Sequence, residues 1–441
     1  MAEKTAKKQP RFQQVTVMIL MTLFQLLCAA CVVCRQEEPS LNMIYIFFGY
    51  IAAEWLYMLI GNLVTDNDYF ELEAIAFFLS GIGLTVCASF NESYALKQLI
   101  AIGLGLIVYL VMLLLIKDVH FAGLLRYPAA IGSVGVLAAN LLLAETVNGT
   151  LNWIDLGFFS IQPSELVKVA FVLVGAVSLE KLLSITSLTK YIIFSLGCVG
   201  ALFLMKDFGT ALIFFFTFIL IAFMRSGNIR TIVLICAVAL MGAMLIIYFK
   251  PYVANRFAAY RHVWDYIDTT GYQQARVLIY TASGGLFGLG IGEGKLRDVY
   301  AASTDLVFGL ICEEMGLLLG IAVLISFACI ALFAIKSAKS SASTFYAIAA
   351  VAAAGMLLFQ LSLNVFGITD LLPLTGVTLP FVSRGGSSMI CSWGLLAYIR
   401  AAGAPFNPPK PDIAVKKTLP QNKTKALPPK VTSPKKKGGM A

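Results

Sequence analysis

The sequence predicts an all-α protein that crosses a membrane many times, and three observations support this fold class. Of its 441 residues, 59% are hydrophobic and only 13% are charged, a balance that soluble globular proteins do not show. One membrane-spanning helix takes about 20 consecutive apolar residues, and twelve runs of this kind follow one another along the chain. The third observation is that the basic residues gather at the two ends of the chain.

The twelve apolar runs predict about twelve transmembrane helices. They occupy residues 12–34, 42–64, 70–90, 95–116, 124–144, 164–183, 187–205, 209–226, 229–249, 306–335, 341–368 and 383–402. The first two, within 12–64, are separated from the others by the polar stretch TDNDY at 65–69. We interpret them as two additional helices before a ten-helix domain over 65–402. A basic start also fits a signal peptide, but the long first run and the spans after it favour a retained helix.

Most of the net charge of +9 lies in two tails. Residues 1–11 carry four basic residues and one Glu, and residues 403–441 carry nine Lys, one Asp and eight Pro. The positive-inside rule therefore predicts that both tails are cytoplasmic, in contact with anionic lipid rather than with nucleic acid. The Lys/Pro-rich tail cannot bury a core and is predicted to be disordered. The same topology places a long loop at about 250–305 outside.

The cysteine pattern predicts neither disulfides nor a metal site. All nine Cys residues lie in or at the ends of apolar runs, where Cys behaves as a small buried hydrophobe. Cys28, Cys31 and Cys34 have the spacing of metal ligands. However, no second ligand pair follows them, and the chain has only two His residues.

Polar or glycine-rich stretches interrupt the apolar pattern in four places, and lipid cannot satisfy their backbone groups. They must therefore line a cavity or an aqueous surface. In the first, at 148–168, Glu165 and Lys168 lie one helical turn apart. They form either a structural ion pair or a polar wall of a substrate groove. In the second, at 205–212, Asp207 is interpreted as a helix cap.

The third stretch, at 250–305, carries Arg residues among Tyr and Trp and then a glycine-rich run. It predicts short amphipathic pieces along the headgroup surface with guanidinium groups placed for phosphates, or else a plain interfacial anchor. Asp305 follows in the first turn of the tenth span, either as a helix cap or as a general base at the membrane boundary. The fourth stretch, at 369–388, places Arg384 on the outer side of the last helix.

Together, these stretches resemble the SEDS family of cell-wall polymerases, the FtsW, RodA and SpoVE type. The resemblance covers residues 70–402 and rests on the segments WIDLGFFSIQPSE, DFGTAL, GYQ, SGGLFGLGIGEG, TDLVFGLICEEMG and LPLTGVTLPFVSRGGSS. It implies a peptidoglycan glycosyltransferase that polymerises lipid II into glycan strands at the outer face of the bacterial cytoplasmic membrane. It also implies a class B penicillin-binding protein as partner.

Residue by residue, the resemblance implies that Asp305 is the essential acidic residue and that Glu165 and Lys168 are the paired charges of the family. The family's loop arginine falls on Arg256 and its loop glutamine on Gln273. The full predicted substrate-binding set is Trp153, Arg256, Gln273, Arg276, Lys295 and Arg384. The chain departs from the usual family residues at Asn152, Lys206, Leu306 and Arg384.

The implied reaction is glycosyl transfer, with Asp305 taking the proton of the acceptor hydroxyl as the lipid pyrophosphate leaves. Basic groups are expected to stabilise the departing pyrophosphate. A divalent cation such as Mg²⁺ is kept as an alternative source of positive charge. Two other classes are kept as alternatives: a flippase for the lipid-linked precursor, and a non-catalytic scaffold for a penicillin-binding protein. The sequence does not choose among division, elongation and sporulation.

Overall fold

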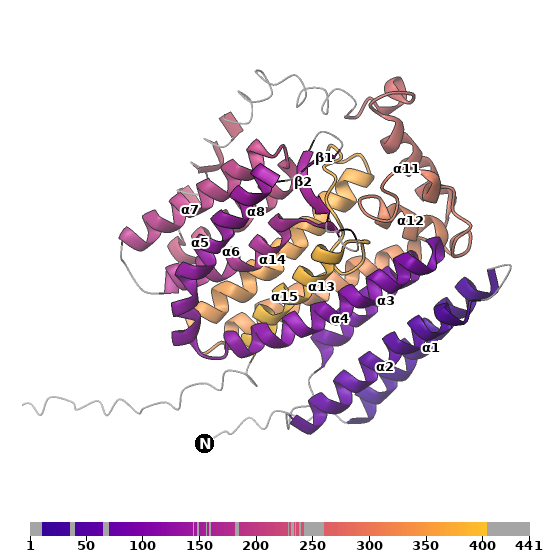
Figure 1. Cartoon of the computed structure of the whole chain (residues 1–441), viewed down its shortest axis with the longest axis horizontal. Helices are drawn as coiled ribbons and strands as arrows, with labels where there is room; N and C mark the ends of the chain where they lie inside the picture. The colour runs from indigo at the N-terminus through magenta and orange to yellow at the C-terminus, as the bar shows by residue number, and fades with distance from the viewer. Residues whose placement is uncertain are drawn as a thin grey trace, which may run out of the picture. The chain divides into compact units, whose positions relative to one another are not determined.

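The structure is almost entirely helical, which confirms the predicted fold class in its coarse form (Figure 1). This computed structural model describes residues 11–35, 40–64, 70–143, 145–147, 150–155, 157, 160–180, 185–227, 229–230, 233, 235–237, 240–241 and 260–403. Within these residues, eight helices are long and apolar enough to cross a membrane. They are α1 (Arg11–Arg35), α2 (Leu41–Val64), α3 (Glu71–Phe90), α4 (Glu92–Leu115), α5 (Val119–Leu143), α8 (Phe208–Ser226), α13 (Leu317–Ser340) and α14 (Thr344–Ile368).

Three further helices coincide with predicted spans, although they are shorter or more charged over the described residues. They are α6 (Pro163–Glu180), α7 (Ile185–Leu204) and α15 (Gly386–Ala401). The span predicted at 229–249 lies largely outside the described residues. The chain is therefore a multi-pass membrane protein, while the count of twelve spans and the cytoplasmic location of both ends stay predictions.

The predicted tenth span, 306–335, is wrong in its start. The chain instead forms a short helix, α12 (Val307–Glu314), and α13 begins only at Leu317. Gly316 separates the two helices with a φ of +89°, and a Cβ at this position would lie 2.3 Å from the carbonyl oxygen of Leu286. A left-handed backbone pressed against another chain segment requires glycine and ends the helix there.

A small antiparallel sheet between α5 and α6 is a second departure from the all-α prediction. Its strands are β1 (Glu145–Val147), β2 (Thr150–Asp155) and β3 (Ser160–Ile161), in the order β1-β2-β3. The polar stretch preceding α6 thus satisfies its backbone groups between strands, and the β-branched and aromatic residues of β2 favour this conformation.

The predicted surface loop contains short helices, as expected, within its described part from residue 260. These are η1 (Val263–Tyr266), α11 (Tyr272–Ser283) and η2 (Leu296–Asp298). They lie beside α12, at one end of the bundle (Figure 1).

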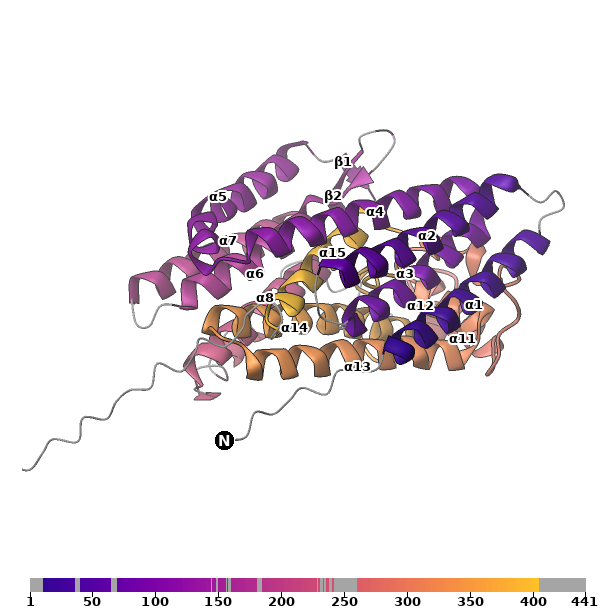
Figure 2. The same ribbon diagram turned by 90° about the horizontal axis from the view of Figure 1, so that it is seen from below.

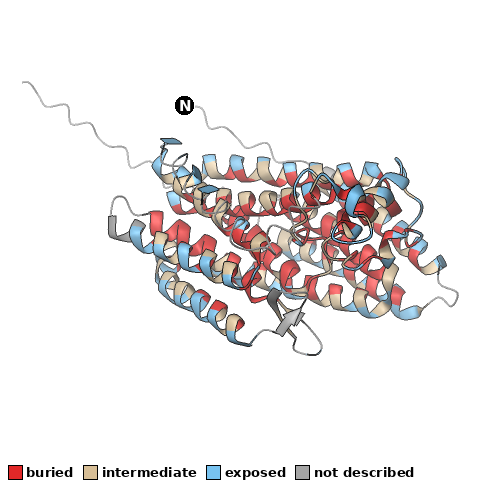
Figure 3. Ribbon diagram, turned by 90° about the horizontal axis from the view of Figure 1, so that it is seen from above, coloured by how far each residue is buried: buried red, intermediate tan, exposed pale blue. Residues whose placement is uncertain are grey.

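The core of the bundle is built around α3, α14 and α15. In the most apolar stretch of each helix, 78% of the residues of α3 and 72% of those of α14 are buried, compared with 17% of those of α5. Figure 3 shows buried residues on the inner sides of the helices. Trp393 of α15 is fully buried, with its ring centroid 5.0 Å from that of Phe77. A Cβ at Gly105 would lie 2.8 Å from Trp393 Cδ1, so α4 and α15 approach closely.

The two additional helices, α1 and α2, pack along the flank formed by α3 and α4 (Figures 1 and 2). A buried bond from Gln25 Nε2 to Glu54 Oε2, 2.6 Å long, joins them to each other. Ser40 and Asn42, at the start of α2, donate to the carboxylate of Glu92 at 2.7 and 2.8 Å. The helices are therefore bonded to the rest of the described bundle by specific polar contacts.

Candidate active site

Asp305 lies in a turn just before α12, and its carboxylate does not cap that helix. The N-cap position belongs to Leu306, which makes no side-chain hydrogen bond. Backbone bonds from Asp305 N and Leu306 N to Ala301 O, at 3.0 and 3.2 Å, close the turn. Asp305 therefore lies one residue before the N-cap rather than in the first turn of the tenth span as predicted, and no described hydrogen bond to its carboxylate caps α12.

The environment of Asp305 makes it a stronger base than an ordinary aspartate. Its pKa is raised to about 6, chiefly by burial; a hydrogen bond with the Thr304 side chain opposes this shift, and the nearby charge of Asp207 adds to it. Such a carboxylate is mostly ionised at neutral pH and still accepts a proton readily, which suits general-base catalysis.

The backbone around Asp305 is fixed by side chains from distant parts of the chain. Asn364 Nδ2, on α14, donates to Asp305 O at 2.8 Å and to Val377 O at 2.7 Å. The Ser383 hydroxyl donates to Thr304 O, in a short hydrogen bond. The loop that connects α14 to α15 thus holds the turn of Asp305 in place.

The same loop closes over the carboxylate. Gly376 has a φ of +68°, and a Cβ there would lie 3.4 Å from Asp305 Oδ2. On its other side the loop lies against the start of α8, where a Cβ at Gly209 would be 3.1 Å from Thr375 O. The carboxylate of Asp305 therefore lies near the turn that carries Asp207.

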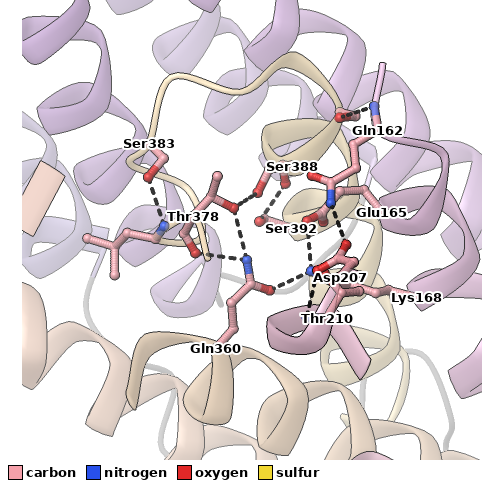
Figure 4. A network of polar contacts seen from close by, with 12 residues as sticks. Gln162, Glu165, Lys168, Asp207, Thr210, Gln360, Thr378, Ser383, Ser388 and Ser392 are labelled. Atoms are coloured by element: carbon pink, nitrogen blue, oxygen red, sulfur yellow. Dashed lines mark hydrogen bonds and ion pairs between the residues drawn. The ribbon is translucent and has the colours of Figure 1, made fainter. Parts of the chain in front are cut away.

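Asp207 caps α8, as predicted, and is also part of a buried polar network (Figure 4). Its Oδ1 accepts from Thr210 N and its Oδ2 from Gln162 Nε2, both at 3.1 Å. Burial raises the pKa of Asp207, and the charge of Lys168 opposes this shift. Two carboxylates, those of Asp207 and Asp305, thus share one polar region.

The expected ion pair of Glu165 and Lys168 lies deeper in this network (Figure 4). Lys168 Nζ is 2.8 Å from Glu165 Oε1 and donates to Gln360 Oε1 at 3.0 Å. Gln360 Nε2 in turn donates to Thr378 O at 2.9 Å. The Lys168 side chain is only 1% exposed, so its charge is neutralised inside the protein.

Two predicted binding residues are bonded to the segment that precedes Asp305. Arg384 N donates to Ser303 O at 2.8 Å, while the Arg384 guanidinium stacks on the ring of Tyr94 at 3.9 Å. Gln273 Nε2 donates to Tyr300 O at 3.1 Å. Arg384 has no partner among the ion pairs of the described residues.

The remaining predicted residues have no described hydrogen bond or ion pair with Asp305. Arg276 lies over the ring of Tyr272 at 5.3 Å, and Lys295 is exposed at the start of η2. Trp153 is half-buried in β2. Arg256 lies outside the described residues.

The sequence analysis did not single out the two amides that organise the site, Gln360 and Asn364. They lie four residues apart in an otherwise apolar span, so they share one face of α14. Polar residues at this spacing inside a membrane helix mark a functional or structural network, and this signal could have found them.

The described residues contain no group of three or more His, Cys, Asp or Glu side chains that could hold a metal ion. A divalent cation that is held mainly by the substrate pyrophosphate stays an alternative.

Comparison with known proteins identifies the family. The model for cell cycle proteins of the FtsW, RodA and SpoVE type matches residues 73–403. The chain belongs to this family. The match covers the whole candidate site and leaves α1 and α2 outside it.

Individual relatives agree with this assignment. Stage V sporulation protein E of Bacillus subtilis (strain 168) is 33% identical over 249 residues, which are 55% of this chain and 68% of that protein. The probable peptidoglycan glycosyltransferase FtsW of Wigglesworthia glossinidia brevipalpis is 31% identical over 268 residues, 58% and 70% of the two chains. The peptidoglycan glycosyltransferase RodA of Mycobacterium leprae (strain TN) is 24% identical over 413 residues, 87% and 88%.

Solved structures share the fold. A chain from a peptidoglycan synthase complex that coordinates polymerization and crosslinking superposes with a TM-score of 0.64 and 25% identity, over 76% of this chain and 97% of that one. The rod shape determining protein RodA of Thermus thermophilus gives a TM-score of 0.57 and 25% identity, over 75% and 95%.

Proposed function

We propose that this chain is a peptidoglycan glycosyltransferase that polymerises lipid II, with Asp305 as the general base. The observation that carries the proposal is the state of Asp305. Its carboxylate is not used to cap a helix, its backbone is fixed by Asn364, and burial raises its pKa to about 6. The names of relatives that match the chain, FtsW and RodA, are those of peptidoglycan glycosyltransferases, which supports the same reaction.

The chemistry follows from one proton transfer and one displacement. The acceptor hydroxyl gives its proton to Asp305, and its oxygen forms a bond to the anomeric carbon of the donor sugar. The bond from that carbon to the pyrophosphate breaks, and its electron pair leaves with the lipid pyrophosphate. General-base assistance of this kind contributes about 10²- to 10⁴-fold to the rate.

Arg384 is the basic residue that we assign first to the pyrophosphate. Its main chain is bonded to Ser303, two residues before Asp305. Its guanidinium is held by an aromatic ring, and no described carboxylate pairs with it. A preorganised cation on the segment that is bonded to the Asp305 turn would stabilise the negative charge of the leaving group. We retain Arg256, Gln273, Arg276, Lys295 and Trp153 as further substrate-binding residues.

We propose that the reaction takes place at the outer face of the bacterial cytoplasmic membrane. The charge distribution of the tails supports this orientation. Contacts between distant segments support the predicted alternation of span direction, because helix ends expected on the outer side lie together. Arg35 pairs with Glu293 of the predicted outer loop. In the same way Ser40 bonds to Glu92, and Arg384 lies over Tyr94. Cysteine labelling from each side of the membrane tests it, and outside labelling near Lys425 would contradict it.

A class B penicillin-binding protein is the partner that we propose. The proposal is supported by the likeness to a chain of a peptidoglycan synthase complex. Copurification of the two proteins from a membrane extract tests it, and failure of the two proteins to copurify would contradict it.

The decisive experiment uses purified protein in proteoliposomes with labelled lipid II. Gel analysis of glycan chains shows polymerisation, and a parallel assay follows movement of lipid II between leaflets. Glycan strands made by the protein alone support the proposal. Lipid movement without strands would indicate the flippase alternative, and neither activity would indicate the scaffold alternative; both results contradict the proposal.

A further inference from the structure

The additional helix α1 ends on the glycine-rich loop beside the candidate site. Arg35 is the last residue of α1, and its Nε lies 2.8 Å from Glu293 Oε1. Its guanidinium also lies over the backbone of Gly292, where a Cβ would be 2.0 Å from Arg35 Nη1. Gly292 has a φ of +82°, so the absence of a side chain at this position both permits the loop conformation and leaves room for the guanidinium.

This loop, residues 284–296 and here called the glycine loop, is bonded to the end of α12. Gly292 N donates to Glu314 Oε2 at 2.8 Å, and Leu296 N donates to Glu313 Oε2 at 2.9 Å. Both glutamates are buried in the last turn of α12. The carboxylates of α12 therefore serve as acceptors for the main chain of the glycine loop.

The glycine loop and Asp305 are connected by α12. This helix has eight residues and begins at Val307, two residues after Asp305. The loop also packs on the middle of the helix, where a Cβ at Gly309 would be 3.2 Å from Leu296 Cδ2. The glycine loop therefore contacts both the middle and the end of the one short helix that begins beside Asp305.

A second guanidinium, that of Arg297, also contacts Gly292. Arg297 donates to Gly292 O at 2.5 Å and to Ser89 O at 2.7 Å. The pKa of Glu314 is raised to about 7, chiefly by burial; the hydrogen bond from Gly292 N and the charges of Arg297 and Arg35 lower this pKa, and the charge of Glu313 raises it. The two guanidinium groups therefore favour the ionised carboxylate that accepts from the loop.

We propose that Arg35 is a positioning residue for the polymerisation reaction: by binding Glu293 and covering Gly292, it fixes the glycine loop on α12 and thereby places Asp305. The inference rests on the proposed function. It assigns a role to the two additional helices, which lie outside the matched segment 73–403. Because an exposed ion pair adds little to global stability, its effect should be local to the loop.

The test reverses the charges of the pair. Arg35→Glu, Glu293→Arg and the double variant are compared with the wild-type chain in proteoliposomes. The matched control is Glu92→Gln, which weakens the bonds of α2 residues to α4 without touching the glycine loop. One readout is amide hydrogen exchange of residues 288–296, and the other is kcat and KM for glycan synthesis.

We expect each single reversal to raise exchange in the loop about tenfold and to lower kcat about threefold to tenfold with KM unchanged, and the double variant to restore both. The inference would be overturned if amide exchange of the loop in Arg35→Glu stayed at the wild-type rate, or if exchange of the loop rose as much in Glu92→Gln. A double variant that recovers neither slow exchange nor kcat would overturn it as well. If the wild-type chain makes no glycan, the proposed function fails, whereas the exchange measurement still decides the role of Arg35.

Discussion

The side-chain amide of Asn364 holds the carbonyl oxygen of Asp305 at 2.8 Å, and the same nitrogen holds the carbonyl oxygen of Val377 at 2.7 Å. Asn364 is 2% exposed. A buried residue of α14 thus joins the turn of the proposed base to the loop that closes over it. Such support is what keeps a catalytic group within reach of its substrate.

Replacing Asn364 by Ala should lower kcat about tenfold and leave KM nearly unchanged. The change leaves two carbonyl oxygens without their donor, a loss of about 1–3 kcal/mol for each buried group that water cannot reach. Steady-state polymerisation kinetics and thermal unfolding measure the two effects. Ser362→Ala is the matched control, because the hydrogen bond that this hydroxyl makes among the described residues is to Leu358 O of its own helix. Equal rates for the two variants would contradict the positioning role.

The rate of polymerisation should rise as pH increases through about 6. Below the raised pKa of Asp305 the carboxylate already carries a proton and cannot accept another. Two variants should move the midpoint in opposite directions. Thr304→Val removes a hydrogen bond that lowers this pKa, so the midpoint should rise, and Asp207→Asn removes a charge that raises it, so the midpoint should fall. Midpoints that do not move, or that move together, would show that Asp305 does not control the profile.

Neutralising one partner of the Glu165–Lys168 pair should destabilise the protein more than neutralising both. A lone charge would remain in a site where Lys168 is 1% exposed, at a cost of about 3–5 kcal/mol. Thermal unfolding of Glu165→Gln, Lys168→Met and the double variant tests this. We expect the double variant to recover most of the loss. Single variants as stable as the wild type would contradict it, and a stable but inactive double variant would favour the substrate-groove interpretation.

Arg384→Gln should raise the apparent KM for lipid II several-fold without changing the unfolding temperature. The guanidinium lies 3.9 Å from the ring centroid of Tyr94 and has no acidic partner among the described residues, so its loss affects phosphate binding more than packing. Arg384→Tyr, which replaces the guanidinium by an uncharged aromatic ring, serves as a second probe. An unchanged KM in both variants would exclude the phosphate role.

Apolar run length was enough to predict most of the helices, because a membrane helix must satisfy its backbone internally over a fixed thickness. It misplaced the tenth span because residues 306–312 are apolar and, apart from Glu313 and Glu314, continue into the apolar run of α13, whereas the chain forms two separate helices. The break lies at Gly316, whose backbone is pressed against Leu286 of the glycine loop. Such a contact is a tertiary feature that hydropathy does not contain.

Of the residues around the candidate site, Asp305, Glu165 and Lys168 were singled out from the sequence, whereas the buried amides Gln360 and Asn364 were missed. Asp305 and the pair Glu165–Lys168 stand out because charge is costly at these depths. Gln360 and Asn364 are uncharged and were read as part of an apolar span, and their importance depends on the carbonyl groups opposite them. The roles assigned to all these residues stay predictions.

The most direct test of the account is glycan synthesis by purified Asp305→Asn. The amide keeps the size of the side chain but cannot take the hydroxyl proton, and helix capping is not at stake because Leu306 holds the N-cap position. Gel analysis of the products from labelled lipid II, with thermal unfolding to verify the fold, gives the answer. We predict a folded, membrane-inserted protein that makes no glycan strands. Long strands at close to the wild-type rate would contradict the assignment of Asp305 as the base.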